Sequence, residues 1–181
     1  MAERFSCYLA LGDSMSIDFY PAQDNRLPPD SGEDLGAASL LFRNHSDLWN
    51  EFQGRDLNSM FPKIYFSPQA IDGATTHYLV DKTTLAELEP FRTARVLVSL
   101  TIGGNDLLQA IRLAASTDVE VLVSEVRAIV SRFNQVVDTL ETHLKNALFL
   151  LTTVYDPTDG TGIIPGDTFR GRLPIQNSTM R

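Results

Sequence analysis

Four short runs of mostly apolar residues recur along the chain and predict β-strands. Each run is continuous, is rich in residues that favour strands and ends in turn residues, which is typical of strands buried on both faces of a sheet. The runs are residues 5–11 (FSCYLAL), 63–67 (KIYFS), 95–102 (RVLVSLTI) and 147–154 (ALFLLTTV). The pattern therefore predicts four buried strands.

Three segments between these runs place apolar residues at helical spacing. They are residues 35–53, 75–88 and, with the clearest period, 118–146. In the last segment the stripe consists of Val119, Leu122, Val126, Ile129, Phe133, Val136, Leu140 and Leu144. Thr117 and Glu120 have the spacing of a capping box at its start. Because strands alternate with helices, we expect an α/β protein, with a parallel sheet covered by helices on both faces.

Composition and charge indicate a single globular domain and argue against a protein that binds nucleic acid. With 181 residues, 43% of them hydrophobic, the chain is expected to form one domain with a buried core. Its net charge of −8 and the absence of a basic run argue against a nucleic-acid partner. The single cysteine, Cys7, cannot form an internal disulfide and is expected in a core strand.

The sequence also bears on location and cofactors. The N-terminal MAERFSCYLALGDS is unlike a signal peptide, and no apolar stretch approaches the length of a membrane span. We therefore expect a cytoplasmic protein without stable membrane insertion. Residues 20–34 are rich in Pro and Asp, but their spacing matches no metal-ligand template and favours a solvated loop. We expect no metal and no organic cofactor.

Three polar, glycine-bearing motifs follow the first three predicted strands. They are GDSMS (12–16), DGATTH (72–77) and IGGNDLL (102–108). In an open parallel sheet, ligands bind outside the carboxyl ends of the strands. Each motif alone is explained by a turn or loop, but all three at consecutive strand ends favour a shared site.

The residue types in these motifs suit acyl transfer. Ser14 carries a hydroxyl that becomes a nucleophile once a base takes its proton. The tetrahedral oxyanion that follows needs hydrogen-bond donors, which the backbone N–H of Gly73 and the side-chain amide of Asn105 are able to supply. The pattern indicates half of an acyl-transfer site.

From residue 8 to about 157 the sequence resembles the SGNH hydrolases, also called GDSL-type lipases and esterases. GDSMS corresponds to the first block of the family, Gly73 in DGATT to the second and GGND to the third. The resemblance implies a flavodoxin-like three-layer α/β/α sandwich. It also implies that Ser14 is the nucleophile and first oxyanion donor, and that Gly73 and Asn105 are the second and third donors. The supporting residues of these blocks are Asp13, Gly104 and Asp106. GDSMS has Met15 where Leu is commonest, and no G-x-S-x-G motif of the α/β-hydrolases occurs.

The last block of that family, Asp-x-x-His, is missing from the chain. The three histidines, His45, His77 and His143, have Phe, Ala and Leu three residues earlier. His45 lies on the apolar stripe of 35–53 and is expected at the core, and His143 suits a helix terminus. His77, four residues past Gly73, is the nearest substitute for a catalytic base.

We therefore expect residues 1–181 to be a single SGNH domain that is truncated at its C-terminus and lacks the last strand and helix. The run at 147–154 would then form an apolar edge strand through which the chain can self-associate. A triad without its base keeps only the residual catalysis of the oxyanion hole and binding.

Three hypotheses of function follow. The leading one is a serine hydrolase that cleaves small-molecule, lipid or carbohydrate esters through an acyl-enzyme on Ser14. The alternative is an inactive fragment or relative that binds an acyl or acetylated ligand without turnover. A flavodoxin-like nucleotide or signalling domain fits least, because the loop after the first strand offers one glycine to a phosphate.

Overall fold

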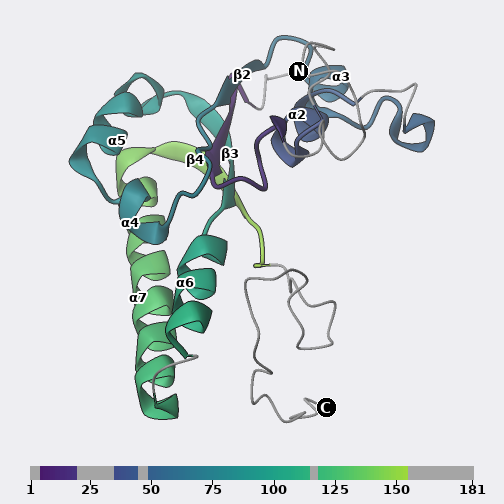
Figure 1. Cartoon of the computed structure of the whole chain (residues 1–181). Coiled ribbons are helices and arrows are strands. Elements are labelled where there is room, and N and C mark those ends of the chain that lie inside the picture. Colours follow the sequence, from purple (N-terminus) through teal and green to yellow (C-terminus); the bar gives the residue numbers. More distant parts are fainter. Residues whose placement is uncertain (1–4, 20–34, 45–48, 115–117, 155–181) are drawn as a thin grey trace, which may run out of the picture.

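The computed structural model describes residues 5–19, 35–44, 49–114 and 118–154. They contain one parallel sheet with the strand order β2-β1-β3-β4 (Figure 1). The strands are β1 (Cys7–Gly12), β2 (Tyr65–Pro68), β3 (Arg95–Thr101) and β4 (Asn146–Leu151). All four predicted strands are confirmed in place, and so is their parallel pairing. The predicted stretch 20–34 lies outside the described residues.

Helices cover both faces of the sheet, as the alternating pattern predicts. α2 (Ala37–Phe42) and α3 (Leu57–Met60) lie on one face (Figure 1). The other face carries α4 (Thr76–Leu79), α5 (Lys82–Glu87), α6 (Gly104–Ala114) and α7 (Val119–His143). Two 3₁₀ turns, η1 (Asn50–Phe52) and η2 (Glu89–Phe91), complete the described elements. The predicted three-layer α/β/α sandwich is confirmed.

The central strand β1 is buried along its whole length, and its side chains alternate between two cores. Cys7, Leu9 and Leu11 pack in one core with the α7 residues Val136 and Leu140. The intervening Tyr8 and Ala10 pack in the other core, against residues of α2 and α3. Because successive strand residues point to opposite faces, one apolar strand joins both helical layers. Cys7 therefore lies in a core strand, as expected.

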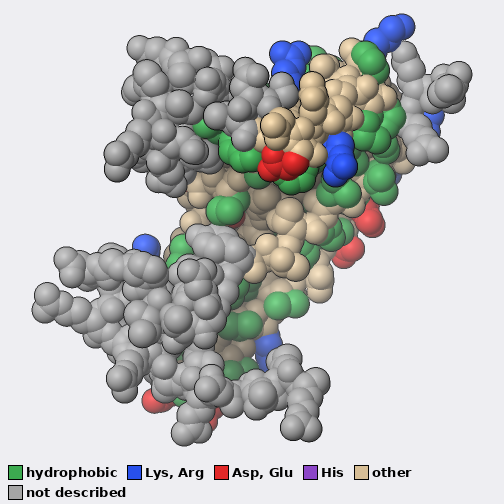
Figure 2. Space-filling view, turned by 90° about the vertical axis from the view of Figure 1, so that its right-hand side faces the viewer, with side chains coloured by type: hydrophobic (Ala, Val, Ile, Leu, Met, Phe, Trp, Pro, Cys, Tyr) green, Lys and Arg blue, Asp and Glu red, His purple; other side chains and the backbone are tan. Residues whose placement is uncertain are grey.

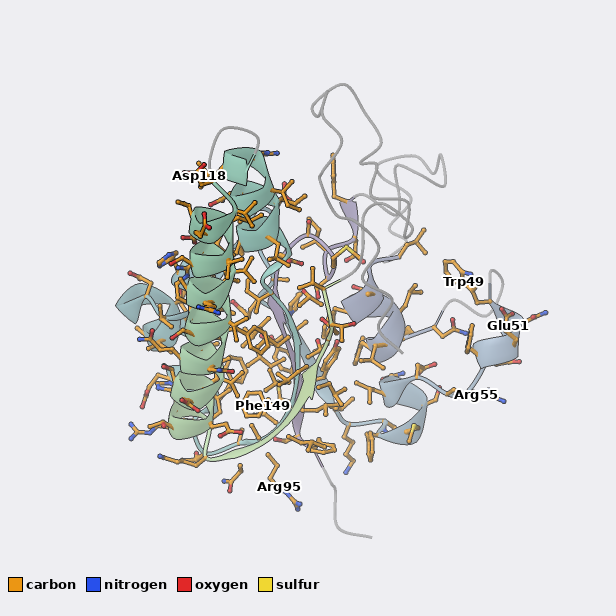
Figure 3. The ribbon with its side chains drawn as sticks, turned by 90° about the horizontal axis from the view of Figure 1, so that it is seen from below. Trp49, Glu51, Arg55, Arg95, Asp118 and Phe149 are labelled. Carbon is orange, nitrogen blue, oxygen red and sulfur yellow. The ribbon has the colours of Figure 1, made fainter. Side chains whose placement is uncertain are left out.

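The outer strands are less buried than the sequence predicts. Tyr65 in β2 is 63% exposed, and Leu148 and Leu150 in β4 are also exposed. In β4 the alternate residue Phe149 points toward α7 and packs in the core beneath it (Figure 3). An edge strand has one neighbour instead of two, so its continuous apolar run remains partly exposed within the described part of the chain.

The two shorter predicted helices are broken. The helix expected over 35–53 ends at Phe42, and the described residues that follow hold only the short 3₁₀ turn η1. The helix expected over 75–88 is divided into α4 and α5, with the Asp81 N–H bonded to the Tyr78 carbonyl in a tight turn. Apolar spacing identifies a buried face but does not fix where a helix ends.

The long predicted helix is confirmed as α7, with corrections at its start. Its N-cap is Asp118, whose side chain makes no capping bond, and the capping box predicted from Thr117 to Glu120 is not tested. Thr117 itself lies outside the described residues. Val119 is 65% exposed and Val126 is also exposed, because this half of α7 extends beyond the sheet beside α6 (Figure 1).

The described residues on the face that carries α2 and α3 are of mixed character (Figure 2). Acidic and basic side chains of the described residues are scattered there among hydrophobic ones (Figure 2). Within the described ranges, no helix is both long and apolar enough to cross a membrane.

Candidate active site

The turn after β1 holds Ser14 at the carboxyl edge of the sheet. It is anchored to Thr101, the last residue of β3: the Asp13 N–H donates to the Thr101 carbonyl at 2.7 Å, and the Ser16 and Thr101 hydroxyls are 2.9 Å apart. The Met15 N–H donates to the Asp13 carboxylate at 3.1 Å, closing the turn. Ser14 is half-buried at its tip.

The segment after β2 runs back along the same turn. The Ile71 N–H donates to the Gly12 carbonyl at 2.9 Å, so the segment that leads to Gly73 starts beside the end of β1. Gly73 is exposed and has a φ of +75°, in the left-handed region that glycine adopts without strain. A tight turn follows, in which the Ala74 N–H bonds to the Ile71 carbonyl at 3.1 Å.

The third motif is a helix start rather than a loop. Gly104, Asn105 and Asp106 form the first turn of α6, immediately after Gly103 with its φ of +103°. The Asn105 side-chain amide donates to the Ala74 carbonyl at 2.9 Å. A primary amide has two N–H donors, so this bond fixes the group beside the Gly73 loop and leaves one donor for a ligand.

The structure thus brings the three predicted motifs together at one edge of the sheet. Ser14 and Asn105 line a common cavity of about 120 Å³, whereas Gly73 does not line it and is linked to Asn105 only through the carbonyl of its neighbour Ala74. Among the described residues, the N–H groups of Ser14 and Gly73 make no hydrogen bond. The Ser14 hydroxyl, the two backbone N–H groups and the second N–H of the Asn105 amide therefore remain able to hydrogen-bond a ligand.

One wall of this cavity is apolar. Its lining residues are Asp13, Ser14, Met15, Gly104, Asn105, Leu107, Leu108, Ile111 and Val154. The polar members lie at the strand ends, and the aliphatic ones come mainly from α6. Sequence reasoning missed Leu107, Leu108 and Ile111, although their i, i+1, i+4 spacing after GGND places them on adjoining faces of one helix.

The three supporting residues have different surroundings. Burial raises the pKa of the Asp13 carboxyl, and hydrogen bonds from Met15 and Thr101 only partly oppose this. A Cβ added at Gly104 would lie 3.5 Å from the Asp13 carboxylate, an ordinary contact. Asp106 is buried and binds Thr76 instead of lining the cavity.

The histidines do not complete a triad within the described residues. His77 is exposed on α4 and does not line the cavity. His143 is the last residue of α7, the helix terminus expected for it, with its Nε2 atom 3.4 Å from Glu89. His45 lies outside the described residues. In the same part of the chain, no group of three or more His, Cys, Asp or Glu residues could hold a metal ion.

Comparison with solved structures shows which fold this is. A lipase from a goat rumen metagenome aligns over 84% of this chain and 65% of its own, at 18% identity, with a TM-score of 0.52. An extracellular lipase from Streptomyces rimosus aligns over 81% and 58%, at 21% identity and a TM-score of 0.43. A GDSL-like lipase from Parabacteroides merdae aligns over 89% and 65%, at 18% identity and a TM-score of 0.46.

The rumen lipase carries the structural argument, because its TM-score is above 0.5. It shows that the chain shares the α/β fold of this lipase, in keeping with the resemblance of the three motifs to the SGNH (GDSL-type) hydrolases. The chain spans between 58% and 65% of the length of these three solved structures. No family model matches the sequence, and no curated protein does.

Proposed function

We propose that this protein is a serine ester hydrolase that works through an acyl-enzyme on Ser14. The observation that carries the proposal is the cavity that Ser14 and Asn105 line together, with the Asn105 amide also bonded to the carbonyl of Ala74, the residue after Gly73. Ordinary turns do not require donor groups from separate segments to meet at one place, whereas an oxyanion hole does. The lipase fold of the rumen enzyme is in keeping with this function.

The mechanism has two acyl-transfer steps. The Ser14 Oγ attacks the ester carbonyl carbon while its proton passes to a base, and the N–H groups of Ser14 and Gly73 and the Asn105 amide stabilise the oxyanion. The intermediate collapses by expelling the alkoxide, which takes up a proton, and leaves the acyl group on Ser14. Water then attacks the acyl-enzyme, releasing the acid and restoring the serine.

The apolar wall of the cavity suggests which esters fit. Leu107, Leu108 and Ile111 extend along α6 from Asn105, so an acyl chain whose carbonyl oxygen faces Asn105 would lie against them. Burying aliphatic carbons there is favourable in proportion to the apolar area removed from water. An aliphatic acyl ester therefore suits the cavity better than an acetylated sugar.

One observation favours a second candidate. No histidine lines the cavity in the described part of the chain, so the base that the first step requires is not evident there. The second candidate is a protein that binds an acyl ligand in this cavity without turnover. Ligand binding needs the donors and the apolar wall but not the base.

The experiment that tests the proposal is hydrolysis of p-nitrophenyl acetate and butyrate by the wild-type chain, Ser14→Ala and Ser124→Ala. Ser124 is the control, since it is an exposed serine of α7 that does not line the cavity. Turnover lost in Ser14→Ala and kept in Ser124→Ala would support the hydrolase. Equal rates in all three proteins, with retained binding of butyrate, would support the ligand-binding candidate instead.

A further inference from the structure

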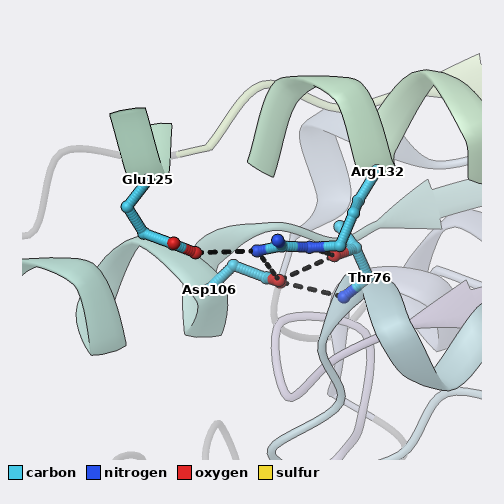
Figure 4. Close-up of polar contacts among 4 residues, drawn as sticks. All are labelled: Thr76, Asp106, Glu125 and Arg132. Carbon is cyan, nitrogen blue, oxygen red and sulfur yellow. Dashed lines mark hydrogen bonds and ion pairs between the residues drawn. The ribbon is translucent and has the colours of Figure 1, made fainter. Parts of the chain in front are cut away.

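A buried carboxylate completes the first turn of α4, the helix that follows the Gly73 loop. Asp106 accepts hydrogen bonds from the Thr76 N–H at 2.9 Å and from the Thr76 hydroxyl at 2.7 Å (Figure 4). The preceding residue, Thr75, is in the N-cap position but makes no side-chain capping bond. Asp106 therefore acts as an N-cap supplied from another helix.

This cap acts on the same loop as the Asn105 side chain. Asn105 bonds to the Ala74 carbonyl, and its neighbour Asp106 bonds to Thr76, two residues later in the loop. Two consecutive residues of α6 thus hold the loop at two points. Displacing either contact would shift the Gly73 N–H relative to the Asn105 amide.

Arg132 on α7 is the cation that faces this cap. Its Nη2 atom lies 3.6 Å from the Asp106 carboxylate, and its Nε donates to the Thr76 hydroxyl at 3.2 Å. Nη2 also donates to Glu125 at 3.1 Å (Figure 4). Thr76 is completely buried, and the Asp106 side chain is 2% exposed.

The burial of Asp106 gives Arg132 its importance. A carboxylate removed from water is costly unless it is hydrogen-bonded and paired, and loss of one partner leaves the other uncompensated. The guanidinium contacts both members of the cap at once, with its planar set of N–H donors. An ammonium in the same place would offer charge without that geometry.

We propose that Arg132 is a positioning residue for the oxyanion hole: it holds Asp106 on Thr76 and thereby keeps the Gly73 loop in register with Asn105. This inference rests on the proposed function of the site. Arg132 does not line the cavity and touches no reacting atom, so it acts only through Asp106 and Thr76. Through Arg132, the helix α7 thus fixes the position of the Gly73 N–H relative to the Asn105 amide at the carboxyl edge of the sheet.

The test compares the wild-type chain with Arg132→Gln, Arg132→Lys and the matched control Arg127→Gln, an exposed arginine on the same helix. Amide hydrogen exchange is followed by NMR at Thr76 and across β1. We expect exchange at Thr76 to rise about tenfold or more in Arg132→Gln, with β1 unchanged, to rise less in Arg132→Lys and to stay the same in Arg127→Gln. Unchanged exchange at Thr76, or an equal rise across β1, would overturn the proposal.

The second measurement is hydrolysis of p-nitrophenyl butyrate. A misplaced donor weakens the transition state more than the bound ester, so kcat should fall about tenfold in Arg132→Gln while KM changes less than about twofold. A rise in KM alone would contradict the positioning role. If the wild-type chain shows no turnover that depends on Ser14, the proposed function fails, and the exchange experiment still decides the role of Arg132.

Discussion

The peptide N–H of Asp13 donates a 2.7 Å hydrogen bond to the carbonyl oxygen of Thr101. The bond joins the turn that carries Ser14 to the end of β3, just before the glycines that lead into α6. Two candidate site segments, 88 residues apart in sequence, are thereby held by one backbone contact. Its geometry requires glycine at position 12, which has a φ of +126°.

Replacing that glycine should unfold the site. In Gly12→Ala the new Cβ would collide with the backbone carbonyl of Thr101, in a backbone conformation that alanine rarely adopts. We expect a loss of at least about 3 kcal/mol in the free energy of unfolding, measured by urea denaturation. Gly54→Ala is the matched control: its φ is +74° but nothing lies within 4 Å, so about 1 kcal/mol should be lost. Similar losses in the two variants would contradict the role of the Thr101 contact.

The apolar wall of the cavity predicts a change in acyl preference. Ile111→Trp should fill space beside the apolar wall and lower turnover of p-nitrophenyl octanoate about tenfold relative to the acetate. Gln109→Trp, at an exposed position on the same helix, should leave the ratio unchanged. If the chain has no turnover, calorimetry should show weaker binding of decanoate to Ile111→Trp than to the wild-type chain. Gln109→Trp should bind decanoate as the wild-type chain does. A ratio unaffected by Ile111→Trp would place the acyl chain elsewhere.

The buried thiol of Cys7 predicts a pH dependence of stability. Burial raises its pKa from 9.0 to about 11, so between these values the unfolded chain loses a proton that the folded chain keeps. Stability should therefore fall as pH rises through this window, by at most about 1.4 kcal/mol for each pH unit. Urea denaturation of the wild-type chain and of Cys7→Ala across this range measures the difference. An identical slope in both proteins would show that Cys7 does not contribute.

Self-association through β4 remains a prediction. In the described residues β4 is the outermost strand, and Leu148 and Leu150 are exposed on the face opposite α7. Two copies related by a two-fold axis would pair these edges antiparallel. Sedimentation velocity should detect a dimer that Leu148→Lys weakens, while Met60→Lys, at an exposed site on α3, does not. A monomer at all concentrations would rule this pairing out.

The sequence by itself determined the strands and the site motifs. A strand such as β1 needs only a short apolar run, and the glycines and polar residues at the strand ends mark the turns that follow. Parallel order also follows from alternation, because helices must carry the chain back between strands. That the motifs carrying Ser14, Gly73 and Asn105 lie at one edge of the sheet was therefore predictable.

Only the tertiary structure decided how those motifs are held. The break after Leu79 depends on a local turn that competes with helical hydrogen bonds, and apolar spacing does not reveal it. The links from Asn105 to Ala74 and from Arg132 to Asp106 join segments far apart in the chain, with no common sequence motif. Such contacts arise when packing removes a carboxylate or an amide from water and each must find the partner that the fold brings near.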